Sequence, residues 1–279
     1  MRSSVNEPRY RRVFLRADGS PTIGMGHVVR SLALAGELSD LGIEVAVSGS
    51  RVREGKAIAH SFESIPVLES DANGADITAI QEFRPDLVIA DGYHFTKSFF
   101  LALEQSGIDY GVIDDNGETQ AVHPRFVLNQ NPSAAIVGYS ERFPDAELFL
   151  GLEWVLMRRE IWAASGIFPD PGTKTVVAMG GADPLNLTEH IVEVLSERSS
   201  DLKVFLGPAT QDRVRRCDAL AQLKSVSLGE PSELVSEMAR SKMCVLGAGS
   251  SLWEAVALRR PVLAVILADN QWAPVEEAR

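Results

Sequence analysis

The stretch RVFLRADGSPTIGMGHVVRSLALAGELSDLG, residues 12–42, decides the fold. Its first six residues, 12–17, form a mostly apolar run with the length of a buried strand. A glycine-containing turn follows, and from residue 26 the apolar side chains recur at helical spacing until Gly42, which ends the helix. The stretch therefore predicts one strand–loop–helix unit, the building block of a parallel α/β sheet.

The same alternation continues along the chain and then restarts after a connector rich in Pro and Gly at residues 169–172. We therefore expect two doubly wound Rossmann-like domains that face a cleft, an N-terminal domain of residues 1–150 and a C-terminal domain of residues 151–279. The further strands are expected at 43–50, 85–94, 108–117, 202–208 and 261–270, and strand–turn–helix units at 174–197 and 242–261.

The composition is typical of a soluble globular protein. Of the 279 residues, 45% are hydrophobic and 23% are charged. No apolar run reaches the roughly 18–20 residues that cross a bilayer, and no secretory signal precedes the first strand, so we expect a cytoplasmic protein without membrane insertion. A formal net charge of −11 disfavours nucleic acid as a partner, because its phosphates require a surface of Lys and Arg.

The cysteine content argues against disulfides and zinc. Cys217 and Cys244 form no CxxC pair and have no histidine at ligand spacing. We expect no cofactor and no metal. We also expect a monomer, since each half has enough apolar residues for a core of its own.

Three glycine turns stand between strands and helices, where ligands bind in parallel α/β sheets. A phosphate can approach the backbone N–H groups of such a turn at the positive end of a helix, and serine hydroxyls add donors. Each turn taken alone is equally well explained as a tight connection. The first turn has Val29 in place of the third glycine of a dinucleotide fingerprint, which disfavours a nicotinamide cofactor. The candidate substrate-binding residues of the turns are Gly24, Gly26, Gly180, Gly181, Gly249, Ser250 and Ser251.

His27 lies in the first turn, at the start of the predicted helix. A lone histidine is more often structural than catalytic. At a helix N-terminus, however, the macrodipole disfavours the imidazolium, which keeps the ring neutral and able to accept a proton. His27 is therefore the candidate general base, and His94, at the end of a predicted strand, is a weaker candidate for the cleft.

Three aspartates at neighbouring strand ends, Asp91, Asp114 and Asp115, allow two interpretations. Carboxylates suit Mg²⁺, so the group could hold that ion. Aspartates at strand ends more often cap helices or fix loops, and that interpretation is preferred.

The first turn is flanked by Arg16, Asp18 and Arg30, which either contact substrate or brace the loop. We include Arg16 and Asp18 among the candidate substrate-binding residues. Trp154 and Trp253 stand among apolar residues and are expected in the core.

Seven motifs, taken in their order and spacing, resemble the UDP-sugar hydrolase family of pseudaminic acid biosynthesis, often called PseG. That family is similar in fold to the two-domain GT-B glycosyltransferases. The resemblance runs from about residue 12 to residue 271 and implies hydrolysis of UDP-2,4-diacetamido-2,4,6-trideoxy-β-L-altropyranose to UDP and the free sugar, with inversion. The motifs are RADGSPTIGMGHVVRSLALA (16–35), DLVIADGYH (86–94), VIDDNGET (112–119), FVLNQNPS (126–133), LGLEWVLMRREI (150–161), MGGADPLNLT (179–188) and GAGSSLWEAVALRRPVLAVILADNQ (247–271).

The resemblance also implies roles for individual residues. The histidine of the family's GxGH turn falls on His27. The resemblance therefore implies that His27 is the base that activates water. Tyr93 and Asn270 are implied near the sugar or the attacking water, and Glu254 on the ribose hydroxyls. The pyrophosphate is implied at Gly249, Ser250 and Ser251.

Two features depart from the pattern. Ser31 stands where cysteine is common, and after Asn270 only residues 271–279 are left for the helix with which GT-B folds return to the first domain. Two alternative functions stay open: a GT-B glycosyltransferase with a UDP-sugar donor, and a non-catalytic nucleotide-sugar-binding protein. A transferase for lipid-linked acceptors should expose a basic and apolar patch, and the sequence of the N-terminal half shows none.

Overall fold

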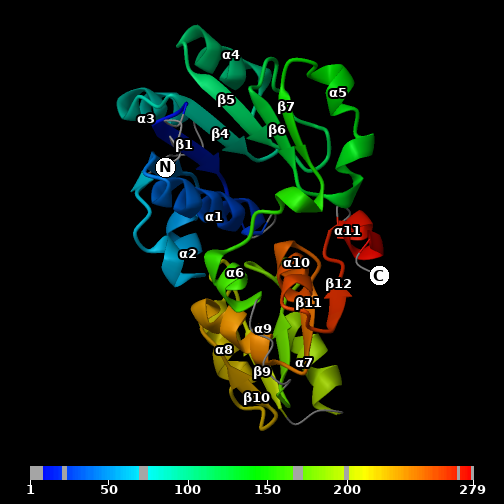
Figure 1. Ribbon diagram of the computed structural model, residues 1–279. Helices are drawn as coiled ribbons and strands as arrows, with labels where there is room; N and C mark the ends of the chain where they lie inside the picture. Colours follow the sequence, from blue (N-terminus) through cyan, green and yellow to red (C-terminus); the bar gives the residue numbers. More distant parts are fainter. Residues whose placement is uncertain are drawn as a thin grey trace, which may run out of the picture.

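The computed structural model describes residues 9–20, 24–68, 75–165, 172–197, 201–268 and 271–277. Two parallel β-sheets, one above the other in Figure 1, form its framework, and helices cover them. The predicted architecture of two doubly wound α/β units is therefore confirmed.

The upper sheet winds outward from a central strand pair, β1 and β4, in which Ala17 lies beside Asp91. Its strand order is β3-β2-β1-β4-β5-β6-β7. Alternate side chains of β1 enter separate cores on the two faces, with Val13 and Leu15 on one side and Phe14 on the other. The strands are β1 (Arg12–Ala17), β2 (Glu44–Ser48), β3 (Val67–Leu68), β4 (Leu87–Asp91), β5 (Asp109–Ile113), β6 (Phe126–Asn129) and β7 (Glu147–Leu150).

The lower sheet repeats this winding around a central pair, β8 and β11. Its order is β10-β9-β8-β11-β12, so the direction of winding reverses between β8 and β11 as it does between β1 and β4. Two core clusters again lie on its opposite faces. The strands are β8 (Thr175–Ala178), β9 (Leu202–Phe205), β10 (Val226–Leu228), β11 (Met243–Gly247) and β12 (Val262–Val265).

Helices connect most of the consecutive strands in both units, whereas β5 and β6 are joined by a loop. The first helix ends at Asp40, shortly before Gly42, whose positive φ of 80° suits glycine and stops the helix where the sequence predicts. The helices are α1 (Gly26–Asp40), α2 (Val52–Lys56), α3 (Ala75–Phe83), α4 (Lys97–Gln105), α5 (Tyr139–Arg142), α6 (Arg159–Ser165), α7 (Thr188–Ser196), α8 (Arg213–Leu220), α9 (Leu234–Arg240), α10 (Ser250–Ala257) and α11 (Trp272–Glu277). Short 3-10 helices are η1 (His60–Phe62), η2 (Pro132–Ile136), η3 (Leu152–Trp154) and η4 (Pro231–Glu233).

All predicted strands are present, whereas the short strands β3, β6, β7 and β10 are additional. Trp253 is buried as predicted, with 7% of its surface exposed. The prediction for Trp154 is wrong: it follows the edge strand β7, makes a T-shaped contact with Phe149 and is 42% exposed. Among the described residues, no helix combines the length and apolar character needed to cross a bilayer.

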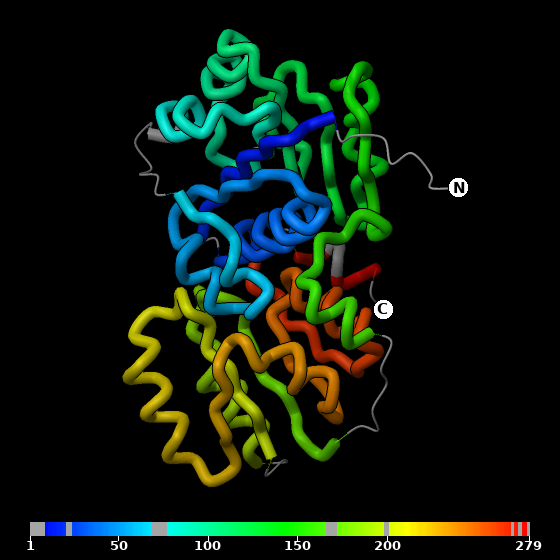
Figure 2. The backbone as a smooth tube through the Cα atoms, turned by 60° about the vertical axis from the view of Figure 1, so that its left-hand side comes forward, coloured from blue at the N-terminus to red at the C-terminus, as the bar shows by residue number. Residues whose placement is uncertain are grey.

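The two units are joined along one side by the segment that contains α6, seen beside the junction in Figure 2. Ile161 of α6 packs in a core of the lower unit, while Glu160 accepts hydrogen bonds from the backbone N and the hydroxyl of Ser61, both 3.0 Å long. At the C-terminal end, the described residues of α11 contact η2 of the upper unit. The segment after residue 270 thus returns to the first domain as a short helix.

Candidate active site in the interdomain cleft

A cavity of about 490 Å³ lies between the two units. Its walls come from segments that follow the central strands β1, β4, β8 and β11, with further residues after β5 and β9. In both sheets these central strands mark the point where the winding reverses, which is where open α/β sheets bind ligands. The cleft predicted between the two domains is therefore present.

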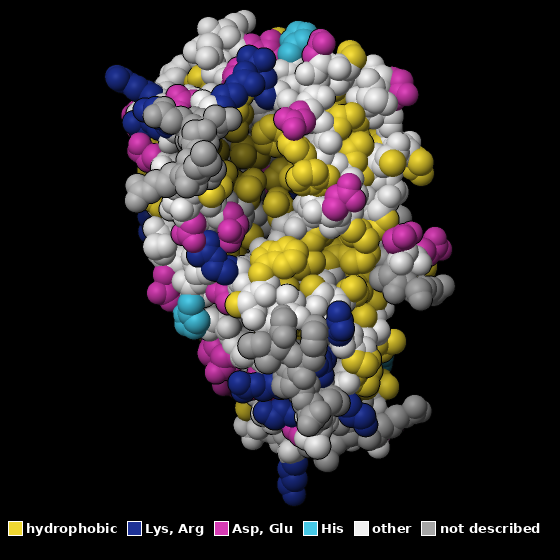
Figure 3. Space-filling view, in the orientation of Figure 1, with side chains coloured by type: hydrophobic (Ala, Val, Ile, Leu, Met, Phe, Trp, Pro, Cys, Tyr) yellow, Lys and Arg dark blue, Asp and Glu magenta, His cyan; other side chains and the backbone are white. Residues whose placement is uncertain are grey.

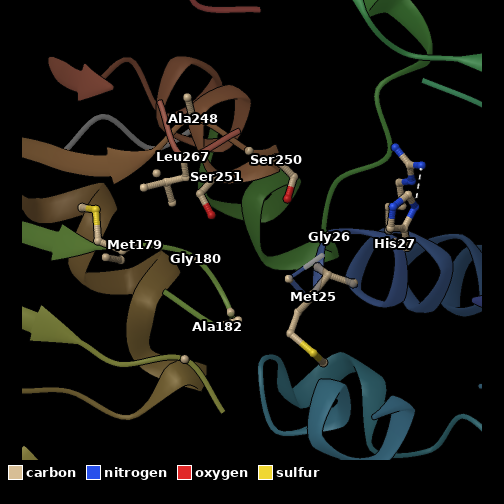
Figure 4. Close-up of a pocket in the computed structure, with 18 of the residues that line it drawn as sticks. Met25, Gly26, His27, Met179, Gly180, Ala182, Ala248, Ser250, Ser251 and Leu267 are labelled. Atoms are coloured by element: carbon tan, nitrogen blue, oxygen red, sulfur yellow. Dashed lines mark hydrogen bonds between the residues drawn. The ribbon is translucent and has the colours of Figure 1, made fainter. Parts of the chain in front are cut away.

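At the start of α10, the backbone N–H of Leu252 donates to the O of Gly249, whereas those of Ser250 and Ser251 have no acceptor among the described residues. Among the described residues, no side chain caps this helix, and a Cβ on Gly249 would meet nothing within 4 Å. Ser250 and Ser251 line the cavity here (Figure 4). Uncapped N–H groups and the helix dipole favour an anion at this end of the helix.

The turn before α7 differs, because its free N–H groups are already satisfied. The carboxylate of Asp183 accepts hydrogen bonds from the backbone N of Leu187 at 2.9 Å and from the hydroxyl of Thr188 at 2.7 Å. Gly180 and Gly181 still line the cavity, and a Cβ on Gly181 would come within 2.4 Å of Met25 from the upper unit. These glycines therefore allow close approach of the two units.

His27 occupies the second position of α1 and lines the cavity on the side of the upper unit. Figure 4 shows it at the start of this helix, across the cavity from Ser250 and Ser251. Its ring is largely buried, and its edge packs against the ring of Tyr93 with centroids 4.9 Å apart. Its Nδ1 lies 2.6 Å from Oδ1 of Asp91 and 3.0 Å from a guanidinium nitrogen of Arg30.

The partner of Nδ1 fixes the tautomer of His27. An arginine nitrogen only donates, and an ionised carboxylate only accepts, so Nδ1 cannot satisfy both neighbours. Because the contact with Asp91 is the shorter one, we assign the proton to Nδ1, donated to Asp91. The basic nitrogen is then Nε2, for which the described residues supply no hydrogen-bond donor.

Arg30 keeps the carboxylates around His27 ionised. Burial alone would raise the pKa of Asp91, but the charge of Arg30, together with His27, lowers it to about 2. The same guanidinium lowers the pKa of Asp115 despite burial. The site therefore contains two carboxylates and one arginine in fixed charge states at neutral pH.

A pH dependence of stability follows from the lowered pKa of Asp91. A carboxyl group with a pKa of about 2 in the folded chain and an ordinary value of 3.8 stabilises the fold above about pH 4, and this contribution disappears as the pH falls toward 2. We expect Asp91→Asn to lower the free energy of unfolding by about 2 kcal/mol at pH 7. Urea unfolding at pH 7 and pH 3 should show the difference between variant and wild type shrinking at the lower pH, and a constant difference would contradict the linkage.

Tyr93 belongs to the loop after β4 and is 42% exposed. Its hydroxyl donates a hydrogen bond to Oδ2 of Asp115 at 2.9 Å. Tyr93 and His27 therefore lie together at the cavity wall, and the role that the resemblance implies for Tyr93, near the sugar or the attacking water, stays a prediction.

Glu254 lies in α10 and forms a buried, two-pronged ion pair with Arg158. The distances are 2.8 Å from Nε to Oε1 and 2.5 Å between the second nitrogen and Oε2, and both residues are 2% exposed. Burial alone would lower the pKa of Arg158, but the carboxylate of Glu254 raises it. Both residues line the cavity, and each carboxylate oxygen retains a lone pair for a further donor.

Comparison with known sequences supports the resemblance drawn from the motifs. No protein-family model matches the chain. It is 24% identical to the UDP-2,4-diacetamido-2,4,6-trideoxy-beta-L-altropyranose hydrolase of Campylobacter jejuni, over 93% of both chains. An uncharacterised protein of Methanocaldococcus jannaschii is also 24% identical over 93% of this chain, which spans 56% of that protein's length.

Solved structures share the fold at low sequence identity. The UDP-GlcNAc 2-epimerase of M. jannaschii, solved with UDP-GlcNAc and UDP, superposes with a TM-score of 0.61 at 14% identity, over 95% of this chain and 86% of the epimerase. The glycotransferase of kitacinnamycin gives 0.61 at 17% identity, over 97% and 84% of the two chains. MurG of Acinetobacter baumannii gives 0.53 at 14% identity, over 95% and 82%. The protein has the GT-B fold. The predicted fold class is therefore confirmed.

The GT-B cleft brings most of the predicted site residues together. Arg16 and Asp18 are not among the cavity-lining residues: they pair with each other at 2.7 Å, and Asp18 also lies 2.9 Å from Nε2 of His94. Asn270 lies outside the described residues, so its role stays a prediction. The predicted residues that line the cavity are Gly24, Gly26, His27, Tyr93, Gly180, Gly181, Gly249, Ser250, Ser251 and Glu254.

The three aspartates have the partners expected of loop-fixing residues. Asp91 and Asp115 bind Arg30, and Asp114 accepts a hydrogen bond from the hydroxyl of Tyr139 at 3.0 Å. In the part of the chain that the structure describes, no three His, Cys, Asp or Glu side chains converge as metal ligands.

Sequence reasoning missed Arg158, Gln130 and Asn131 as cavity-lining residues. A signal for Arg158 exists, because the arginine directly follows the apolar run VLM at residues 155–157. A charged residue at such a place needs a partner if it is buried. The identity of that partner, 96 residues away, has no local signature.

Proposed function

We propose that this protein acts on a UDP-sugar and hydrolyses a UDP-linked 2,4-diacetamido-2,4,6-trideoxyhexose of the altropyranose type, as a cytoplasmic step of pseudaminic acid biosynthesis. Support comes from the C. jejuni hydrolase, to which the chain is similar over 93% of both lengths. The GT-B fold, with its cavity at the strand ends of both units, is compatible with a nucleotide sugar that bridges the units.

The observation that carries the mechanism is the short contact between Nδ1 of His27 and the carboxylate of Asp91. Nδ1 is bound to Asp91 at 2.6 Å, so Nε2 is the nitrogen that accepts a proton. In the proposed step, a water oxygen bonds to the anomeric carbon while its proton passes to Nε2. The bond from this carbon to the diphosphate oxygen breaks, and its electron pair leaves with UDP, which inverts the configuration.

The two sides of the cavity have different proposed roles in this step. The uncapped start of α10, with Ser250 and Ser251, is the proposed binding site for the departing diphosphate, because N–H dipoles fixed in advance stabilise the developing charge. On the opposite side, the ring of Tyr93 contacts the ring of His27, and its phenol oxygen is the proposed ligand of the attacking water. Glu254 remains the proposed ligand of the ribose hydroxyls.

A glycosyltransferase would use the same cavity with a different acceptor. Figure 3 shows an apolar area in the middle of one face of the molecule, with both acidic and basic side chains at its border. A lipid-linked acceptor would favour a basic border, and this border is mixed. The similarity to the C. jejuni hydrolase over 93% of both chains supports water as the acceptor.

Incubation of the protein with the UDP-diacetamido-trideoxy sugar alone, in water enriched in oxygen-18, tests the function. We expect release of UDP, with the label on the anomeric carbon of the free sugar and none on UDP, and an inverted anomer in the first NMR spectra. Release only after addition of a sugar acceptor would identify a transferase. No release at saturating substrate would leave a binding protein, and an epimerised nucleotide sugar without free UDP would also contradict the proposal.

A further inference from the structure

Arg30 connects two carboxylates that come from neighbouring strands of the upper sheet. Its Nε and one terminal nitrogen donate to Asp91, at 2.7 and 2.6 Å, and its terminal nitrogens donate to Asp115, at 2.7 and 2.9 Å. The guanidinium is buried, with 5% of the residue exposed. Asp91 ends β4 and Asp115 follows β5, so one cation ties together the ends of two adjacent strands.

Each carboxylate in turn holds one of the two side chains that face the reacting centre in the proposed mechanism. Asp91 accepts the hydrogen bond from Nδ1 of His27, and Asp115 accepts the hydrogen bond from Tyr93. The rings of His27 and Tyr93 contact each other. The five side chains therefore form a closed loop of contacts, in which Arg30 is the only cation with a permanent charge.

We propose that Arg30 is a positioning residue for the reaction: by binding Asp91 and Asp115 at once, it holds Nδ1 of His27 on Asp91 and the Tyr93 hydroxyl at the cavity wall, and its charge opposes protonation of the His27 ring. The role as positioning residue in catalysis rests on the proposed function. The effect of its charge on the ring is a property of the folded chain alone.

The charges around His27 explain why a cation is needed there. The charged and titratable groups that face the ring are Arg30 from its own helix, Asp91 from β4, Tyr93 from the loop after β4 and Asp115 from the loop after β5. Two buried carboxylates within reach favour the imidazolium, which cannot act as a base. Arg30 offsets this attraction, because a guanidinium at 3.0 Å repels a second positive charge on the ring.

The test is an NMR titration of the His27 ring in protein with ¹⁵N-labelled histidine, the signal being assigned from His27→Gln. In the wild type we expect the neutral form of the ring to carry its proton on Nδ1. In Arg30→Met, the midpoint of the titration should rise by about 1–3 pH units, the size expected for the loss of one charge at close range. Arg30→Lys keeps the positive charge but loses the planar guanidinium that binds both carboxylates at once. The midpoint of the His27 titration should therefore move less in this variant than in Arg30→Met, while the contact between Tyr93 and His27 weakens.

A second variant keeps the proposal testable if Arg30→Met does not fold. Asp115→Asn removes one negative charge and should move the midpoint downward, and the double variant should lie between the two singles. The matched control is Arg216→Met, because Arg216 also joins two carboxylates, Asp183 and Glu189, at 2.5 Å each, but in the lower unit. This control should leave the His27 titration unchanged.

Activity provides the second readout. In Arg30→Met, the acidic limb of the pH–rate profile for UDP release should move upward together with the NMR midpoint, with recovery of rate at high pH. An unchanged titration in both Arg30→Met and Asp115→Asn would overturn the proposal. Because the titration needs no substrate, failure of the proposed hydrolase activity would be seen separately.

Discussion

His27→Gln is expected to lower kcat for UDP release by about 10²–10⁴-fold, the usual contribution of a general base. Glutamine keeps a polar side chain at the start of α1 but accepts no proton near neutral pH. The affinity for UDP should change little, because the proposed diphosphate site is the start of α10 in the other unit. Steady-state rates and UDP titration calorimetry give the two values.

The matched control for this variant is His60→Gln. His60 is also a histidine at the start of a short helix, but its side chain is 77% exposed and pairs with Glu63 on the surface. It should retain the full rate. If His27→Gln turned over at the wild-type rate, the assignment of the base would be wrong, whereas equal losses in kcat and UDP affinity would indicate a structural role.

Glu254→Gln is expected to lower the free energy of unfolding by about 3–5 kcal/mol, because it leaves Arg158 buried without a charged partner. Arg158 is 2% exposed, and its other hydrogen-bond acceptor among the described residues is the backbone O of Ile58, at 3.3 Å. The bond from Arg158 to Ile58 crosses from one unit to the other, and the ion pair with Glu254 holds the guanidinium that donates it. Loss of this ion pair should therefore also weaken the junction between the units. Denaturant unfolding followed by circular dichroism measures the loss.

An ion pair on the surface, next in sequence to the buried pair of Arg158 and Glu254, provides the control. Arg159, the following residue, pairs with Glu37 and Asp40, and its side chain is 42% exposed. Arg159→Met should therefore cost no more than about 1 kcal/mol. In the double variant Arg158→Met with Glu254→Met, neither charge is left unpaired, so part of the stability should return. Equal losses in Arg159→Met and Glu254→Gln would refute the buried-pair argument.

The central strands could be predicted from sequence because burial on both faces leaves a continuous apolar run, as in β4 and β8. The additional strands lack this signal. β3 has two residues, and the two end residues of β10 are only half-buried, so their patterns are too short or too mixed to distinguish from loops. Their place in the sheet depends on pairing with neighbours rather than on their own residues.

The residues of the candidate site that could be predicted are those that belong to a local sequence pattern. His27 and the turn at Gly249 stand at strand–helix junctions, which sequence periodicity locates. The partners of Arg30 could not be inferred in this way. Asp91 and Asp115 are 61 and 85 residues away, and only the order of strands in the sheet brings their carboxylates to one guanidinium.

The arginines in the wall of the cavity have a consequence for capture of an anionic nucleotide. Arg30 and Arg158 are each neutralised by carboxylates, so attraction at close range comes from fixed amide dipoles, whose fields fall off within a few ångströms. At longer range, a molecule with a net charge of −11 repels the approaching diphosphate. Added salt screens this repulsion, so the association rate constant should rise with ionic strength, the reverse of electrostatic steering.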